Sequence, residues 1–443
     1  MLKFNFQKLF FMLVGLFLTS CCFAKAYPDL LLVLKAASLN DPTYQNQVAK
    51  FNAILQQIPE NRAPLLPQLD LSSTIDREIS DTARNGNTYT TPANSGLNVT
   101  QTIFNLNLFR LLARAKDTVQ AAVVTLSAEQ QNLMIRTATA YYGVLQAEDI
   151  LSYTEQQQAF IRRQLTATKT RYEHRDATIT DLQQAQGADD LISAELVTAK
   201  LNLYNAYQRL SEITSKIYPG LASLKNTFPL ISPQPTNLSV WLKLFDTDNL
   251  TLRAARLDIV TANENIKVNQ ANYLPTLSAN VDYNNGQTQT TSSRSRTITQ
   301  ADENASVGLN LNWQAYQGGL TTAQIDQAVA EQEQTEANMR KAYLSAASET
   351  RQAYTGVLLG INRINSDRSA VTMNTNALNN ADEGYRAGVV TITEVLQIQY
   401  QLFNSQKQYA QDLYAYLLDI LRLKQAAGTL SVTSIAEENQ WLE

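Results

Sequence analysis

The placement of proline constrains this chain more than any other feature. The eleven prolines fall in two groups, at positions 28–92 and 219–275, and none occurs between the groups or after Pro275. A proline inside a helix costs about 3 kcal/mol, so two very long stretches are free to be helical. These stretches are rich in Ala, Gln, Leu and Glu, which favour helices. At 1.5 Å per residue the longest helix would extend about 100 Å, and such long helices suggest a coiled-coil-like assembly. The expected long helices cover 105–172, 317–384 and 392–427.

Four short segments follow a different pattern, in which apolar and polar residues alternate. Leu69 and Leu71, for example, alternate with Gln68, Asp70 and Ser72. A period of two with one apolar face predicts β-strands. Polar, turn-rich segments at 81–94 and 286–304 separate the members of each pair and are expected to be water-exposed loops. The four predicted strands lie at 68–79, 97–103, 277–283 and 307–313.

The chain also repeats itself. The segment 140–145 (AYYGVL) recurs 213 residues later as 353–358 (AYTGVL), and the segment 172–181 recurs at the same offset as 385–394. Each half is predicted to contain a helix, a two-stranded hairpin, a very long helix, a turn and a second helix. A period near 210 residues indicates a duplicated domain rather than a solenoid. The expected organisation is a signal peptide at 1–24, a first repeat at 25–218, a Pro-rich equatorial linker at 219–245, a second repeat at 246–428 and a C-terminal equatorial tail at 429–443.

The N-terminus has the features of a secretory signal. Lys3 and Lys8 precede an apolar stretch that is too short to span a membrane, and Ala24 or Ala26 supplies a small residue for cleavage. The segment that ends at Cys21 also resembles a bacterial lipobox, in which Cys21 would be acylated. Both alternatives predict an exported protein, and no later segment has about 18 consecutive apolar residues.

Composition excludes several classes of function. Residue 174 is the single histidine, both cysteines lie in the predicted signal, and the net charge is −4. These features argue against metal centres, His-dependent nucleophiles and nucleic-acid binding. No acid/base pair or phosphate-binding loop is found, so we expect no enzyme, no catalytic residues and no cofactor.

Strands with one apolar face in an exported chain are typical of a bacterial outer-membrane barrel. Four strands cannot close a barrel, because the smallest membrane barrels have about eight, and an open edge cannot lie in lipid. Several copies must therefore share one barrel, with eight strands from two chains or twelve from three. The alternative is a secreted or surface coiled-coil protein with a structural or adhesive function and no pore.

Five motifs follow one another along the chain: APLLPQL at 63–69, TATAYYGVL at 137–145, LSYT at 151–154, YQGG at 316–319 and YRAGVVTITEVL at 385–396. Together they resemble the TolC family of outer-membrane efflux and secretion channels. The resemblance implies an α+β membrane protein: a homotrimer with a shared twelve-stranded antiparallel β-barrel in outer-membrane lipid and a long α-helical periplasmic tunnel. It also implies a passive duct for drugs, other small molecules or proteins, in efflux or type I secretion. The partners would be a periplasmic adaptor and an inner-membrane pump, either ABC-type or proton-driven.

The resemblance assigns roles to the two helix-to-helix turns. Glu394 matches the first acid of a narrow pore ring, whereas Gln397 replaces the second acid, so a trimer would have three ring carboxylates rather than six. Asp181 matches a gating carboxylate whose hydroxyl partner would be Tyr385. A simpler interpretation is that Asp181 and Glu394 complement the dipoles of the helices that they begin. The other implied residues are Thr180 and Val390 in the gating links, with Val390 in place of a basic residue, and Arg175, Asp176, Gly388 and Val389 in the adaptor-docking turns.

Overall fold

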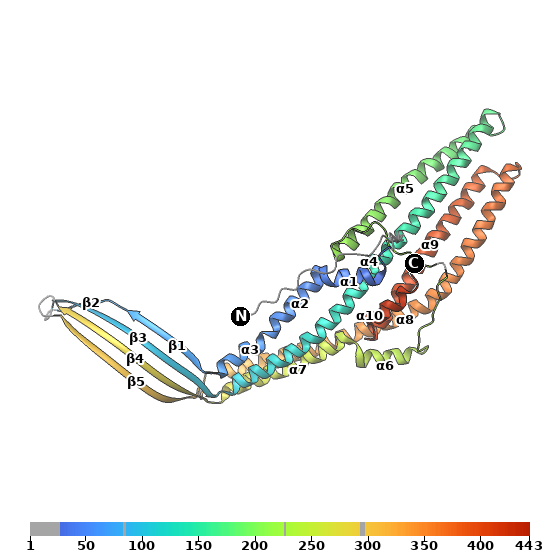
Figure 1. The fold of residues 1–443 in the computed structure, drawn as a ribbon. Coiled ribbons are helices and arrows are strands. Elements are labelled where there is room, and N and C mark those ends of the chain that lie inside the picture. The colour runs from blue at the N-terminus through green and yellow to red at the C-terminus, as the bar shows by residue number, and fades with distance from the viewer. Residues whose placement is uncertain (1–26, 83–85, 226, 293–296) are drawn as a thin grey trace, which may run out of the picture.

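The computed structural model describes residues 27–82, 86–225, 227–292 and 297–443. The molecule is elongated, with a β-sheet at one end and the turns of two long helical hairpins at the other (Figure 1). The expected signal peptide, with its alternative acylation site Cys21, lies outside the described residues.

The two halves of the chain have parallel element orders. In the first half, short helices lead into strands, which lead into one very long helix and its return helix, and the second half repeats this order. The first-half elements are α1 (Leu30–Asn40), α2 (Pro42–Leu55), α3 (Gln57–Arg62), η1 (Ala63–Leu65), β1 (Gln68–Ile75), β2 (Glu78–Thr82), β3 (Gly86–Phe104), α4 (Leu106–Glu173) and α5 (Ile179–Thr214). The second-half elements are α6 (Leu238–Asp248), α7 (Leu250–Gln270), η2 (Ala271–Tyr273), β4 (Thr276–Ser292), β5 (Ile298–Asn312), α8 (Leu320–Arg386), α9 (Ile392–Ala426) and α10 (Val432–Asn439).

The three long helices predicted from proline placement are confirmed. Helix α4 has 68 residues and α8 has 67, so each extends about 100 Å. Asn105 caps the start of α4 with its side chain, and Gly319 precedes α8 in a left-handed conformation. Helix α4 begins two residues after β3 ends, whereas a segment of seven residues, 313–319, joins β5 to α8.

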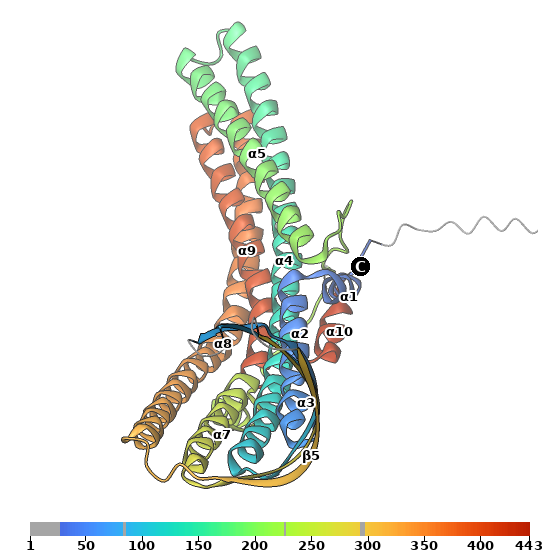
Figure 2. The same cartoon turned by 90° about the vertical axis from the view of Figure 1, so that its left-hand side faces the viewer.

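The sheet is antiparallel, in the order β1-β3-β4-β5, and β2 also pairs with β3. Strands β1 and β2 together form one edge, interrupted at Asp76 and Arg77, and β5 forms the other edge. Seen from the side, the sheet is a curved band at the foot of the helices (Figure 2). The four predicted strands are therefore confirmed, with the first divided into two pieces.

One face of the sheet carries an apolar row that runs in register across β1, β3, β4 and β5. Leu69 pairs with Val99, Val99 with Val281, and Val281 with Val307, and the side chains in this row are mostly exposed in the single chain. The neighbouring row on the opposite face is polar and includes a hydrogen bond between Asn98 and Asp282. The sheet thus has one face suited to lipid and one suited to water.

The prediction that 81–94 and 286–304 are loops is wrong for most of their length. Residues 86–94 belong to β3, 286–292 to β4 and 298–304 to β5, and they continue the same ladder. The alternation of apolar residues marked only the apolar band, whereas Thr-, Gln- and Asn-rich extensions still satisfy their backbone groups by pairing. Residues 83–85 and 293–296, at the hairpin ends, lie outside the described residues.

The core lies midway along the helices. The side chains of Tyr141, Tyr142 and Tyr416 are almost fully buried there. The Tyr142 hydroxyl donates to the carboxyl of Glu438 at 2.7 Å, and burial raises the pKa of Glu438 to about 8. These contacts fasten the C-terminal helix α10 to α4.

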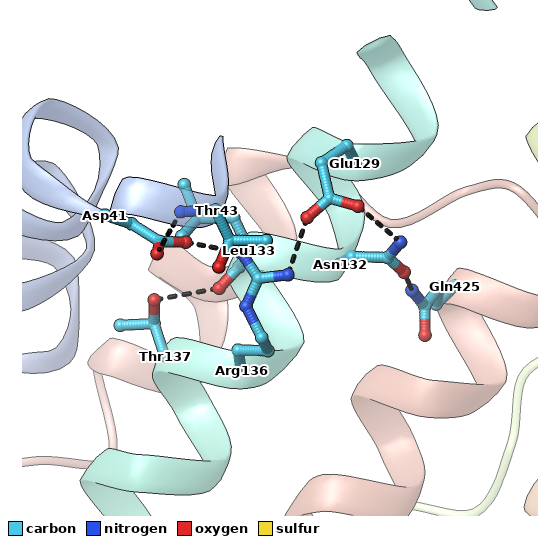
Figure 3. A network of polar contacts seen from close by, with 8 residues as sticks. All are labelled: Asp41, Thr43, Glu129, Asn132, Leu133, Arg136, Thr137 and Gln425. Atoms are coloured by element: carbon cyan, nitrogen blue, oxygen red, sulfur yellow. Dashed lines mark hydrogen bonds and ion pairs between the residues drawn. The ribbon is translucent and has the colours of Figure 1, made fainter. Parts of the chain in front are cut away.

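A polar network fastens the N-terminal helices to the same core (Figure 3). Arg136 of α4 binds Asp41, which caps α2, and also donates to Glu129 at 2.6 Å. Glu129 accepts from Asn132 at 3.0 Å, and Asn132 in turn accepts from Gln425 of α9 at 2.8 Å. The charge-assisted hydrogen bond from Arg136 thus offsets the free-energy cost of burying the Asp41 carboxylate.

Candidate functional site at the helix tips

The two turns at the free end of the helices have the same local chemistry. The first turn, His174–Thr178, joins α4 to α5, and the second, Ala387–Thr391, joins α8 to α9. Thr178 accepts from the Asp181 amide at 3.1 Å, and Thr391 accepts from the Glu394 amide at 3.3 Å. Each turn therefore ends in a threonine N-cap, which satisfies an otherwise unpaired amide.

The preceding helix ends are also equivalent. The Arg175 amide donates to Tyr172 O at 2.9 Å, and the Gly388 amide donates to Tyr385 O at 3.1 Å. The φ angle is +68° at Arg175 and +81° at Gly388. Glycine adopts this left-handed conformation without steric cost, whereas arginine does not. The first turn therefore carries backbone strain that the second lacks.

The two carboxylates differ in their partners. Asp181 accepts from the Thr178 amide at 2.9 Å and the Thr178 hydroxyl at 2.8 Å, which completes a capping box. Glu394 is exposed, and its carboxylate accepts no hydrogen bond from any residue that the structure describes. Asp181 thus stabilises its own helix start, while Glu394 is left available to ions or to other chains.

Tyr385 is the centre of a clamp between the two hairpins. Its side chain is 6% exposed, and its hydroxyl lies 2.8 Å from the hydroxyl of Thr168 on α4. Arg171 donates to the Tyr385 carbonyl at 3.2 Å, and its guanidinium lies 4.8 Å from the Tyr385 ring centroid. A hydrogen bond and a cation–π contact therefore act at one residue. We call Thr168, Arg171 and Tyr385 the tip clamp.

The predicted hydrogen bond between Tyr385 and Asp181 is not formed within the chain. Tyr385 bonds to Thr168 instead, and Asp181 bonds to Thr178. The Asp181 side chain is short, and its carboxylate is held by hydrogen bonds from Thr178 at the start of α5, so it does not reach the neighbouring hairpin. The simpler interpretation of Asp181, as a helix-start residue, describes its contacts in this chain.

Two further contacts join the hairpins. Gln164 of α4 donates to Asp382 of α8 at 2.5 Å. Thr393 of α9 donates to Gln184 of α5. The sequence analysis identified none of these partners, because they are ordinary polar residues inside long helices. The one available signal was the constant offset of 213 residues between the two repeats, which makes Gln184 of the first repeat equivalent to Gln397 of the second.

Val390 has a packing role in the second turn. A Cβ added at Gly384 would lie 2.6 Å from Cγ2 of Val390, so Val390 fills the space over this glycine. Val390 also packs against an apolar cluster that includes Ile392 and Val395. An apolar contact thus stands at the position where the resemblance implied a charged link.

The remaining predicted residues are exposed at the tip. Thr180, Asp176, Val389 and Gln397 all face solvent in the single chain, and Val389 is 80% exposed. No group of three or more His, Cys, Asp or Glu residues suited to a metal occurs in the described part of the chain. The described helices include none that is both long and apolar enough to cross a membrane.

A sheet with one apolar face, continuous with helices about 100 Å long that end in paired turns, defines an outer-membrane channel protein of α+β type. Residues 33–215 and 241–429 match the protein family described as "Outer membrane efflux protein". The chain belongs to this family.

Individual relatives agree with this assignment. The chain is 34% identical to "Outer membrane protein TolC" of Escherichia coli, over 98% of this chain and 89% of the relative. It is 24% identical to "Alkaline protease secretion protein AprF" of Pseudomonas aeruginosa, over 88% of this chain and 82% of the relative. Among solved structures, the Campylobacter jejuni CmeC outer membrane channel has a TM-score of 0.76 at 16% identity, covering 94% of this chain and 90% of that one.

Proposed function

We propose that three copies of this chain form a passive exit duct through the outer membrane, in an efflux pump or a type I secretion system. The observation that carries the proposal is the sheet. Its apolar face is exposed, and both its edges, β1/β2 and β5, are unpaired within the described chain. Unpaired edges are costly in lipid, so strands of other copies must complete the sheet.

The number of copies follows from the strand count together with the family resemblance. One chain supplies four strands when β1 and β2 are counted as one, so three chains supply twelve. The long helices of the same three chains would form a tube that extends into the periplasm. The alternative of a surface coiled-coil protein without a pore leaves the exposed apolar rows of the sheet without a partner.

The tip would be the entrance of this tube. Three copies of Glu394 near the axis would concentrate negative charge, attract cations and hinder anions. Gln397 follows one helical turn later and adds no charge, so the charge of the ring would rest on Glu394. The tip clamp, with Val390 packed over Gly384, would hold the two hairpins of each chain together in the resting state.

A periplasmic adaptor would dock on the turns and on the groove beside them. The turns present Arg175, Asp176, Gly388 and Val389 to solvent. A groove of about 420 Å³ lies between α4 and α8, and its lining includes Arg163 and Arg171 together with Arg386, which is paired with Asp382 at 2.6 Å. Its positive charge suits acidic side chains on a partner. The adaptor would connect the duct to an inner-membrane pump, ABC-type or proton-driven.

The test is reconstitution of detergent-extracted protein into planar lipid bilayers, with mass measurement of the same sample. We expect a species of three chains with cation-selective conductance. A channel-active monomer would contradict the shared barrel, and a trimer without conductance would contradict the duct. Co-purification of an adaptor, reduced by Val389→Asp and unchanged by a substitution on the sheet, would test the docking site.

A further inference from the structure

A cavity of about 370 Å³ lies beside the C-terminal helix α10, far from the tip and from the sheet. Its walls come from the segment 231–234, from α6, α8 and α9, and from α10 with the residues that follow it. Its volume is in the range of small-molecule sites, roughly 300–1,000 Å³. The proposed duct gives this cavity no role.

Most of the cavity wall is apolar or aromatic. Ile420 and Leu423 lie one turn apart on α9, and Trp241 of α6 and Trp441 after α10 add two indole rings. The Trp241 indole N–H donates to the Pro235 carbonyl at 2.7 Å, so the polar end of this ring is already paired. Walls of this kind suit a ligand with an apolar body.

One buried polar atom in the lining lacks a partner. Glu438 is 1% exposed; its Oε2 accepts from the Tyr142 hydroxyl at 2.7 Å, and its Oε1 has no hydrogen-bond partner among the described residues. Burial raises the pKa of this carboxyl to about 8, so it keeps a proton at neutral pH. Since Oε2 receives the Tyr142 hydrogen, the proton belongs on Oε1. A buried O–H without an acceptor is unfavourable, and an acceptor on a ligand would remove that cost.

The other polar groups around Glu438 argue against a charged ligand. Lys424 of α9 also lines the cavity, and its ammonium donates to the carboxylate of Glu437 at 2.8 Å. The Tyr416 hydroxyl is paired with the backbone of Ile231 at 2.7 and 3.0 Å. With Glu438 protonated, these groups carry no net charge. A cation would meet the Lys424 ammonium, and an anion would meet the Glu437 carboxylate.

We propose that this cavity binds a small uncharged molecule that has an apolar body and a carbonyl-type oxygen. The oxygen accepts a hydrogen bond from the Glu438 carboxyl, and the body packs on the apolar and indole walls. A molecule bound there contacts α8, α9 and α10 together and fastens the C-terminal helix more firmly. This inference goes beyond the proposed duct and does not depend on the number of copies.

A matched pair of probes tests the hydrogen bond. Acetophenone has one aromatic ring and one carbonyl, and α-methylstyrene has the same shape with a CH₂ group in place of the oxygen. In equilibrium dialysis at pH 7 against the full chain held in amphipol, we expect acetophenone to bind at least tenfold more tightly. Equal binding of the two probes would overturn the role of Glu438 as the donor.

A bulky substitution tests whether the cavity is the site. Ile420 is half-buried in the wall, so Ile420→Trp should fill the cavity and weaken acetophenone binding at least tenfold. Leu344→Trp is the control, because it adds the same side chain at an exposed position of α8 outside the lining. Unchanged binding in Ile420→Trp would mean that the probe only partitions into the amphipol, and the proposal would be wrong.

The pH dependence separates an uncharged ligand from a cation. With a pKa of about 8, the protonated fraction of Glu438 falls about tenfold between pH 7 and pH 9, and acetophenone affinity should fall with it. Glu438→Gln should bind acetophenone equally at both pH values, because its amide accepts from Tyr142, donates to the ligand and does not ionise. Tighter binding of phenyltrimethylammonium than of acetophenone, increasing with pH, would show a cation site and overturn the ligand class.

Amide hydrogen exchange tests the consequence for the fold. Saturating acetophenone should slow exchange in α10 at least severalfold and leave the tip turns unchanged. Binding without any added protection of α10 would contradict the claim that the ligand fastens this helix.

Discussion

The two turns at the tip come from one duplicated sequence and differ in what their residues do. Both end a long helix with the same backbone hydrogen bonds and begin the next with a threonine cap. In the first turn the carboxylate of Asp181 is used by the cap, and Tyr172 is exposed. In the second turn Glu394 is free, and Tyr385 is buried in a clamp. Duplication has kept the signals that shape the backbone, while the contacts beyond the turn have diverged.

The two turns therefore have different roles at the tip. The second turn presents charge to the proposed entrance and is held by contacts to the first hairpin. The first turn supplies those contacts from Thr168 and Arg171 and keeps its own carboxylate for helix stability. The predictions below change one turn and use the other as its control.

The carboxyl of Glu438 lies in the core, in contrast to the two carboxylates at the tip, and its substitution has the largest expected effect on stability. Burial raises the pKa of Glu438 to about 8 from an ordinary value of 4.5. Between these two pH values the unfolded chain ionises while the folded chain keeps its proton. The free energy of unfolding therefore falls as pH rises from 4.5 to 8, by up to roughly 4 kcal/mol, and levels off above 8.

Denaturant unfolding in detergent at pH 5, 6, 7 and 8 measures this slope. Glu438→Gln should flatten it, because the amide accepts the Tyr142 hydrogen bond and cannot ionise. Glu437→Gln is the matched control: the Glu437 side chain is exposed and paired with Lys424. An unchanged slope in Glu438→Gln would mean that other groups set the pH dependence.

Removal of the Tyr385 hydroxyl should loosen the tip by about 1–2 kcal/mol, since it leaves the buried Thr168 hydroxyl without its partner. We expect Tyr385→Phe to raise resting conductance severalfold in bilayers. Tyr172→Phe, the same change in the first turn, should leave conductance within error. Equal effects of the two substitutions would show that the clamp does not distinguish the turns.

The smallest effect concerns the left-handed residue in each turn. Arg175→Gly should stabilise the first turn by about 1 kcal/mol or less, because glycine adopts the positive φ freely. Gly388→Ala should destabilise the second turn by a similar amount. Amide hydrogen exchange at residues 172–181 and 385–394 reports both changes. Slower amide hydrogen exchange at residues 385–394 in Gly388→Ala would contradict the claim that a non-glycine residue is strained at this positive φ.

Local signals predicted much of this fold. The absence of proline predicted α4, α8 and α9, and apolar alternation predicted where the sheet faces lipid. Alternation could not predict strand length, since the polar ends of β3, β4 and β5 pair through their backbones alone. The repeat located both turns, but the threonine caps at Thr178 and Thr391 were not predicted. It could not predict the tip clamp, because Thr168 and Arg171 act through tertiary contacts that the second repeat lacks.

The most direct test of the difference between the turns is ion selectivity of the assembled channel, measured as reversal potential in a KCl gradient together with block by trivalent cations. Glu394→Gln removes the free carboxylate of the second turn, and Asp181→Asn changes the capped carboxylate of the first. We expect Glu394→Gln to lower cation selectivity and to weaken trivalent-cation block at least tenfold, and Asp181→Asn to leave both within error. If Glu394→Gln left selectivity and block unchanged, Glu394 would serve only its helix, and the two turns would not differ in function.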